Sequence, residues 1–252
     1  MKPILWSLGN FEFRSYYVMM ILGVIVVSVL ALRRARHDGF PEIHQVIDGT
    51  LLIFFTGFVG ARLLYIAHHA DWFLSRPLHI LAVRDGGLTL YGSLFLGGLS
   101  VILYARWRQM TVMKTLDFIL PFMLLVYCFI RIGCFLNGCC YGTACDLPWA
   151  LQFPESITPV HPTQLYEIAS NLALFLFLYL YYPRKKYDGE ITLYFFLFYP
   201  LSRFIIEFWR IDDHPDWQAL TLNQVISVAL LALTIFVLYP ASRRLNKAAK
   251  KS

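Results

Sequence analysis

Apolar runs of about 20 residues recur along this chain, and this feature limits the possible folds more than any other. A run of this length, folded as an α-helix, is long enough to cross the hydrocarbon core of a bilayer. Open sheet edges would leave unpaired backbone groups there, so the runs indicate helices. Charged residues make up only 15% of the 252 residues, against about 25% in an average soluble domain. The sequence therefore predicts an all-α polytopic membrane protein and makes a soluble enzyme a poor fit.

We expect about seven transmembrane helices in a single domain that covers residues 1–252, because no segment resembles a linker. The apolar run from Tyr16 to Leu32 is predicted to be a retained span, since no small-residue cleavage site follows it. The stretch around 70–83 is too polar to cross and is expected at the interface. The remaining spans are predicted at 46–68, 88–105, 116–137, 165–182, 190–209 and 220–239.

Basic residues gather on one set of alternating connections. Groups of Arg and Lys follow the first, third and fifth predicted spans, and another group ends the chain. The positive-inside rule then predicts an N-terminus outside and a C-terminus in the cytoplasm. The net charge of +6 is therefore mostly a topology signal, and nothing else in the sequence indicates a nucleic-acid partner.

Three arginines lie inside apolar spans, at positions Arg62, Arg131 and Arg203. The predicted topology puts all three in the outer half of the membrane. A lone Arg at such a depth is costly, so it normally has a partner or faces a polar site. One interpretation is structural pairing with a carboxylate of Asp85, Glu167 or Glu207. The other is an outward-facing site for an anionic lipid head group, because the planar guanidinium binds phosphate with two parallel hydrogen bonds.

The sixth predicted span carries a polar stripe. Its members are spaced by four, four and three residues and share one helical face: Tyr199, Arg203, Glu207 and Arg210. Glu207 either orients Arg203 or neutralises it.

Small residues mark the third predicted span at Gly92, Ser93, Gly97 and Gly98. Their simplest interpretation is close packing against another helix. The preceding Asp85-Gly86-Gly87 is a turn signal that brings Tyr91 to the depth of the arginines.

The segment 131–142 reads RIGCFLNGCCYG. Its glycines are expected to end the fourth span, which leaves backbone amides and Asn137 available to a ligand. Cysteines cluster here, and a disulfide would join Cys134 to Cys140 or Cys139 to Cys145. Zinc ligation is a further alternative, although no CxxC pair supports it. Cys128 lies deeper in the span and is interpreted as a small core residue.

These motifs resemble those of the prolipoprotein diacylglyceryl transferase family. The segment 131–142 is similar to the family's glycine-rich signature, and four flanking motifs occur in the family's order. They are GARLLY at 60–65, DGGLTLYGSL at 85–94, HPTQLYE at 161–167 and YPLSRFIIEFWR at 199–210. The resemblance extends over residues 14–240.

The resemblance implies a seven-helix enzyme of the bacterial inner membrane with its active site toward the outer face. It implies phosphatidylglycerol as donor and the lipobox cysteine of a prolipoprotein as acceptor. The products would be a thioether-linked diacylglyceryl protein and glycerol phosphate, with no metal or diffusible cofactor. The family's essential arginines correspond to Arg131 and Arg203, its functional tyrosine to Tyr16, and its signature glycine to Gly142.

Two positions depart from the family pattern. Cys134 stands where the family usually has Asn, and Tyr91 stands where it commonly has a His proposed as the base. A phenol with a pKa of about 10 accepts a proton less readily than imidazole at neutral pH. Either Tyr91 is activated by a neighbouring Arg, or it only hydrogen-bonds lipid, or another group takes the proton. His161 is the nearest other candidate unless that residue caps the fifth span.

The sequence thus predicts Arg131, Arg203 and Tyr91 as catalytic residues. The predicted substrate-binding set is Tyr16, Arg62, Asp85, Asn137, Gly142, His161, Tyr199, Glu207 and Arg210. Two other functions stay open: a phosphatidylglycerol-binding protein without chemistry, and a membrane thiol–disulfide oxidoreductase that uses the outer cysteines.

Overall fold

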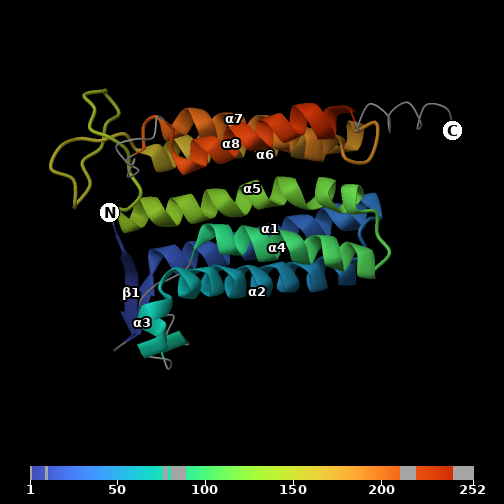
Figure 1. The fold of residues 1–252 in the computed structure, drawn as a ribbon, viewed down its shortest axis with the longest axis horizontal. Coiled ribbons are helices and arrows are strands. Elements are labelled where there is room, and N and C mark those ends of the chain that lie inside the picture. Colours follow the sequence, from blue (N-terminus) through green and yellow to red (C-terminus); the bar gives the residue numbers. More distant parts are fainter. Residues whose placement is uncertain (1, 9–10, 76–78, 81–88, 211–219, 241–252) are drawn as a thin grey trace. The chain divides into compact units, whose positions relative to one another are not determined.

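The protein is described by a computed structural model that covers residues 2–8, 11–75, 79–80, 89–210 and 220–240 (Figure 1). A two-stranded antiparallel sheet of β1 (Ile4–Leu8) and β2 (Phe11–Arg14) comes first. The helices are α1 (Ser15–Asp38), α2 (Ile43–His68), α3 (Ala70–Ser75), α4 (Leu90–Trp107), α5 (Val112–Asn137), α6 (Thr163–Tyr181), α7 (Glu190–Glu207) and α8 (Leu222–Leu233). The short 3-10 helix η2 (Tyr182–Arg184) follows α6, and the π-helix η3 (Thr234–Leu238) follows α8.

Every predicted span coincides with a helix. Among the described residues, four helical segments are long and apolar enough to cross a membrane by length and composition: Ser15–Asp38, Ile43–His68, Val112–Asn137 and Thr163–Arg184. The prediction of a helical polytopic membrane protein is therefore confirmed, and the exact number of spans stays a prediction. The segment expected at the interface contains the six-residue α3.

The chain folds into two compact units. The first, here called the large unit, consists of residues 1–27 and 116–252, and the second, the small unit, consists of 28–115. The boundaries fall inside α1 and α5. The expectation of one domain stays a prediction.

Close helix packing defines the small unit, in which α2 and α4 lie side by side (Figure 1). A Cβ atom at Gly92 would lie 2.1 Å from the carbonyl oxygen of Gly60, so neither position tolerates a side chain. One turn away, a Cβ at Gly57 would lie 2.9 Å from the hydroxyl of Ser93. The packing interpretation therefore holds for Gly92 and Ser93, whereas a Cβ at Gly98 would meet nothing within 4 Å.

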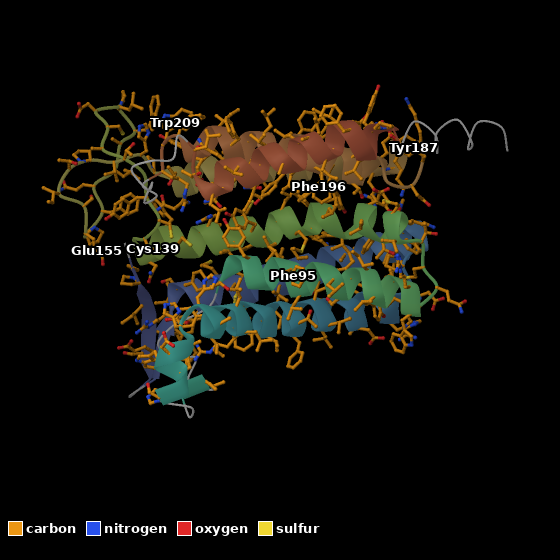
Figure 2. All side chains as sticks on the ribbon, in the orientation of Figure 1. Phe95, Cys139, Glu155, Tyr187, Phe196 and Trp209 are labelled. Carbon is orange, nitrogen blue, oxygen red and sulfur yellow. The ribbon has the colours of Figure 1, made fainter. Side chains whose placement is uncertain are left out.

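In the large unit, α7 packs against both α6 and α8. The labelled side chains of Figure 2 distinguish the two ends of this unit. Cys139 and Trp209 lie at one end, Tyr187 lies at the other, and Phe196 lies between them. The end with Cys139 and Trp209 is called the signature end, because it contains the end of the segment 131–142.

The N-terminal sheet was not predicted. Its strands pair from Ile4 with Arg14 to Leu8 with Phe11, and the rings of Trp6 and Phe13 stack with centroids 4.8 Å apart. The amide of Ser15, the first residue of α1, donates to the carbonyl of Pro3 at 2.9 Å. The sheet is thus joined directly to the start of the first long helix.

Candidate active site

Arg131 lies near the end of α5 and pairs with a carboxylate of α6. Its guanidinium forms an ion pair with Glu167 and donates to the hydroxyl of Tyr127, one turn earlier on α5. The same hydroxyl donates to Oε2 of Glu167 at 3.1 Å. The three side chains therefore share one hydrogen-bonded arrangement between α5 and α6.

Two further arginines meet the same carboxylate. Arg203 Nη1 lies 2.6 Å from Glu167 Oε1, and Arg203 Nη2 lies 2.9 Å from Glu207 Oε2. Arg210 Nη1 lies 3.2 Å from Glu167 Oε1, and its Nε lies 3.6 Å from Glu207 Oε2. The arginine cluster, as the term is used below, consists of three arginines and two glutamates: Arg131, Arg203, Arg210, Glu167 and Glu207. Helix α7 ends at Glu207, two residues before the predicted boundary, so Arg210 reaches the cluster from beyond the helix.

Glu207 is held in place from α8. Its Oε1 accepts hydrogen bonds from Thr221 Oγ1 at 3.1 Å and from Asn223 Nδ2 at 2.6 Å. The side chain of Glu207 is completely buried. The predicted contact between Glu207 and Arg203 is therefore present, and α8 fixes the carboxylate that makes it.

The arginine cluster has an excess of positive charge, because it contains three guanidiniums and two carboxylates. The arginine side chains are 10–14% exposed, whereas the two carboxylates are 0–2% exposed. Burying charges is costly unless they are paired, and each arginine of the cluster is paired with at least one of the two carboxylates.

Gly142 connects the signature segment to this cluster. It forms an isolated antiparallel bridge with Arg210, and its amide donates to the carbonyl of His161 at 2.8 Å. A Cβ at this position would lie 2.0 Å from the carbonyl oxygen of Trp209. Only glycine permits that approach, so Gly142 sets where the backbone of Arg210 lies.

His161 lies beside this bridge, with its side chain buried. Its Nδ1 is 3.2 Å from the hydroxyl of Tyr166, which also accepts a hydrogen bond from Trp149 Nε1 at 2.8 Å. The N-cap of α6 is Pro162, and no side chain caps the helix. The imidazole is thus engaged by Tyr166, while the carbonyl of His161 accepts a hydrogen bond from the amide of Thr163, the first residue of α6, at 2.9 Å.

Three more predicted residues belong to the large unit. Tyr16 lies within electrostatic range of Arg131, and a Cβ at Gly133 would lie only 3.0 Å from the Cα of Tyr16, so α1 and α5 approach closely there. Asn137 is the last residue of α5 and is exposed. The ring of Tyr199 stacks on that of Phe195 with centroids 5.3 Å apart.

Two predicted residues belong to the small unit instead. Arg62 donates from Nη2 to the carbonyl of His79 at 2.8 Å and from Nε to the carbonyl of Ile80 at 3.1 Å. Tyr91 lies in the first turn of α4 and is 40% exposed. Asp85 lies outside the described residues. The third arginine that meets Arg131 and Arg203 in the large unit is therefore Arg210, and the predicted roles of Arg62, Tyr91 and Asp85 stay predictions.

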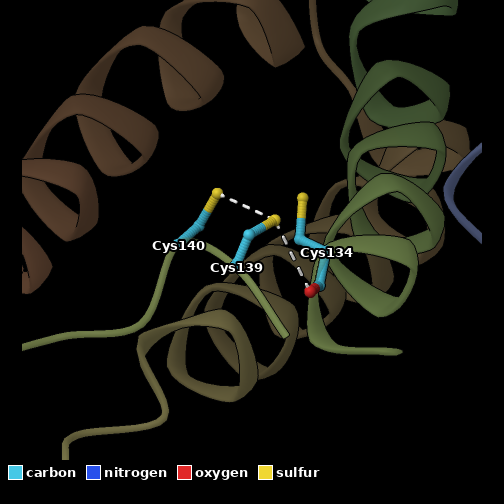
Figure 3. A group of neighbouring side chains, drawn as sticks. All are labelled: Cys134, Cys139 and Cys140. Atoms are coloured by element: carbon cyan, nitrogen blue, oxygen red, sulfur yellow. Dashed lines mark hydrogen bonds between the residues drawn. The ribbon is translucent and has the colours of Figure 1, made fainter. Parts of the chain in front are cut away.

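All five cysteines are free thiols, so neither of the two expected disulfides is formed. Instead, the sulfur atoms of Cys134, Cys139 and Cys140 lie within 4.8 Å of one another (Figure 3). Hydrogen bonding to the neighbouring thiols of Cys134 and Cys140 lowers the pKa of Cys139. Cys128 is buried and its sulfur approaches the carbonyl of Ile168 at 3.7 Å, as expected for a core residue.

Two residues of the site were absent from the predicted set. Glu167 was considered only as a structural partner, yet it contacts all three arginines of the cluster. It is the only acidic residue within α6, which was a usable signal. Tyr127 precedes Arg131 by four residues, so their shared helical face was also readable from the sequence.

Comparison with known proteins agrees with the resemblance. Residues 3–240 match the family described as "Prolipoprotein diacylglyceryl transferase". The phosphatidylglycerol–prolipoprotein diacylglyceryl transferase of Clostridium tetani (strain Massachusetts / E88) is 32% identical over 94% of this chain and 96% of its own length. The enzyme of the same name from Nitratidesulfovibrio vulgaris (strain DP4) is 33% identical over 98% of this chain and 97% of its own length. That from Finegoldia magna is 28% identical over the full length of both chains. Because the family match covers residues 3–240 and the relatives align over nearly the whole chain, this chain belongs to the prolipoprotein diacylglyceryl transferase family.

Proposed function

We propose that the arginine cluster binds the phosphodiester of phosphatidylglycerol while the diacylglyceryl group passes to the cysteine thiol of a prolipoprotein. Family membership supports the reaction. The observation that best supports phosphodiester binding is the composition of the cluster, which has three largely buried guanidiniums and two carboxylates.

The cluster keeps donors for a ligand even though its members are paired. Each guanidinium has five N–H donors, and a carboxylate accepts about four hydrogen bonds. Two of those acceptor sites on Glu207 are already used by Thr221 and Asn223, and one on Glu167 is used by Tyr127. Counted over the five residues of the cluster, the N–H donors outnumber the carboxylate acceptor sites, and this count supports a role in binding phosphate oxygens.

The chemistry requires such donors. The acceptor sulfur attacks the diacylglyceryl carbon that is bonded to the phosphate ester oxygen. A carbon–sulfur bond forms as the carbon–oxygen bond breaks, and the electron pair leaves on the oxygen of glycerol phosphate. The thiol proton passes to a base or to water. Fixed donors aimed at the leaving oxygen are worth about 10²- to 10³-fold in rate for each donor removed, which is the role proposed for Arg131 and Arg203.

The surrounding residues position the reactants. Gly142 fixes the backbone of Arg210, and Glu207 orients Arg203. Tyr16, Asn137 and Tyr199 are proposed to line the site, and Arg62 and Asp85 to support it.

The proton acceptor is proposed to be Tyr91, with His161 as the alternative. His161 belongs to the same unit as the arginine cluster, which supports its candidacy. Tyr91→Phe and His161→Gln each remove the candidate acceptor. We expect the larger loss of kcat with Tyr91→Phe, and a larger loss with His161→Gln would assign the role to His161.

The orientation proposed for the membrane has an external N-terminus and seven spans. Arg184, Lys185 and Lys186 precede Tyr187, at the end of the large unit opposite the signature end (Figure 2). The positive-inside rule assigns that basic end to the cytoplasm. The signature end then faces outward in the cytoplasmic membrane, where both membrane-embedded substrates can approach it.

The decisive measurement is release of glycerol phosphate by the purified protein given phosphatidylglycerol and a lipobox peptide. Arg203→Ala is expected to abolish release, and Arg203→Lys to reduce it strongly because lysine keeps the charge but loses the guanidinium fork. Arg184→Ala is the matched control, since Arg184 is an exposed arginine at the opposite end of the same unit. Near-normal activity of Arg203→Lys would contradict bidentate phosphate binding. Binding of phosphatidylglycerol without any release would favour a lipid-binding protein.

A further inference from the structure

Three thiols form a compact group at the signature end (Figure 3). The sulfur atoms of Cys134, Cys139 and Cys140 all lie within 4.8 Å of one another, and those of Cys139 and Cys140 are 3.4 Å apart. Cys134 is buried in the last turn of α5, Cys139 is half-buried, and Cys140 is exposed. The group therefore has a buried side and a side open to its surroundings.

The loop that brings these thiols together is held by buried residues of α6. Gln164 Nε2 donates to the carbonyl of Cys139 at 2.7 Å, and Thr163 Oγ1 donates to the carbonyl of Cys140 at 3.0 Å. The side chains of both donors are almost completely buried. The amide of Cys139 also donates to the carbonyl of Cys134 at 3.2 Å, which ties the loop back to α5. The approach of the sulfurs is thus imposed by the fold.

The backbone of the loop is specialised as well. Gly138 has a φ of 80° and Cys140 a φ of 68°, both in the left-handed region. Glycine adopts this region without difficulty, but a cysteine does so at a cost that the surrounding contacts must offset. The conformation that turns Cys140 toward the other two thiols is therefore maintained against its local preference.

The geometry suits one soft metal ion. Thiolate sulfurs bind Zn²⁺ at about 2.3 Å, so the sulfurs around a tetrahedral ion are separated by about 3.8 Å. The sulfurs of Cys139 and Cys140 are 3.4 Å apart and all three sulfurs lie within 4.8 Å of one another, so small side-chain movements would bring them to this separation. Thiolates select soft and borderline ions over Mg²⁺ and Ca²⁺, which prefer oxygen ligands.

The charge of the surroundings favours the same ion. Three thiolates and one divalent cation carry a net charge of −1. Arg131, which precedes Cys134 by three residues on α5, acts electrostatically on all three sulfurs. Its positive charge favours the thiolate forms that bind a metal ion.

We propose that Cys134, Cys139 and Cys140 bind one thiophilic metal ion of the Zn²⁺ class at the signature end. Three protein ligands leave one coordination position of a tetrahedral ion for an exogenous ligand. A thiolate is a ligand that such an ion prefers, and the proposed function supplies one in the acceptor cysteine. Binding of the acceptor thiolate to the fourth position rests on the proposed function, whereas binding of the ion by the three cysteines does not.

The test uses the full-length, reduced and metal-free protein in detergent, titrated with Co²⁺ as a spectroscopic substitute for Zn²⁺. We expect one Co²⁺ per chain, with sulfur-to-cobalt charge-transfer absorption and the visible bands of tetrahedral Co²⁺, both displaced by Zn²⁺. Cys139→Ser and Cys140→Ser should lose the charge-transfer intensity and bind at least tenfold more weakly. Cys145→Ser is the matched control, because Cys145 lies outside the group, and it should titrate like the wild type.

Two outcomes would overturn the binding site: absence of the thiolate band in the reduced wild-type protein, or an unchanged titration of Cys140→Ser. Cys140 is the exposed member, so its replacement is the least disruptive to folding, and a thermal unfolding curve checks that the variant is folded.

A second arm adds a lipobox peptide to the Co²⁺-loaded protein. We expect the visible bands to shift with the cysteine peptide and to remain unchanged with its Cys→Ser counterpart. An identical spectrum with both peptides would overturn the open position for the acceptor. Failure of the proposed function looks different, because glycerol phosphate release would then be absent while Co²⁺ binding remained intact.

Discussion

Two buried ionic groups at opposite ends of the large unit use charge in different ways. At the end near Tyr187, the carboxylate of Asp117 accepts four hydrogen bonds at 2.8–2.9 Å, from Lys185 Nζ, the amide of Gly189, and the amide and hydroxyl of Thr192. Asp117 is completely buried and its acceptor sites are fully used. This group is called the Asp117 network.

The arginine cluster has the opposite balance. Its cations outnumber its anions, and its N–H donors outnumber the acceptors that its carboxylates provide. The Asp117 network connects α5 to the start of α7 and leaves no acceptor for a ligand. A saturated group of this kind stabilises the fold, whereas the five residues of the arginine cluster carry one more positive than negative charge, which supports the anion-binding role proposed for them.

The largest effect is expected at the cluster. Arg131→Lys keeps the positive charge but loses the planar fork, so we expect glycerol phosphate release to fall about 100-fold. Initial rates at saturating phosphatidylglycerol measure this fall. The thermal unfolding midpoint should change less than in the Asp117 variant described next. A variant that loses stability but retains its activity per folded molecule would remove the distinction between the two groups.

Breaking the Asp117 network should affect stability instead. Asp117→Asn places an amide donor against Lys185 or Gly189 and removes the buried charge that Lys185 pairs with. We expect a loss of about 3 kcal/mol in unfolding free energy, with the activity per folded molecule unchanged. Thermal or denaturant unfolding in detergent, with activity normalised to the folded fraction, tests this. Asp188→Asn is the matched control, because Asp188 contacts the same Lys185 but is 43% exposed.

A smaller effect is expected where the signature segment meets Arg210. Gly142→Ala forces a Cβ against the carbonyl oxygen of Trp209, so the backbone beside Arg210 must move. Overpacking of this kind costs about 1–3 kcal/mol, and we expect about tenfold lower activity. Gly98→Ala is the control, because a Cβ there meets nothing within 4 Å, and its activity should equal that of the wild type. Equal activity of Gly142→Ala and Gly98→Ala would show that the position of Arg210 does not matter for the reaction.

The two groups were also unequally predictable. The stripe of Tyr199, Arg203, Glu207 and Arg210 was readable because helical periodicity is a local property. The partner shared by three arginines, Glu167, was not identified as central, because contacts between α5, α6 and the segment after α7 join residues far apart in the chain. The Asp117 network was missed for the same reason, since Asp117 and Thr192 are 75 residues apart.

The N-terminal sheet shows a different kind of failure. Gly9-Asn10 between the runs ILWSL and FEFR is a two-residue hairpin signal. The strong apolar run that follows dominates the local pattern and favours a membrane span over a hairpin. The disulfide expectation failed because spacing cannot tell whether thiols meet in bonding geometry, and the loop conformation at Gly138 and Cys140 decides that.

The sequence by itself determined the helical membrane class, the positions of the long helices, the motifs and the family. Those properties depend on local periodicity, apolar length and residue order, which the chain carries without folding. Only the tertiary structure decided that Arg210 joins Arg131 and Arg203 around Glu167, that Gly142 binds the signature segment to Arg210, and that three thiols meet in one place. These arrangements depend on side chains from different helices approaching within a few ångströms, and the packing of the folded unit brings them together.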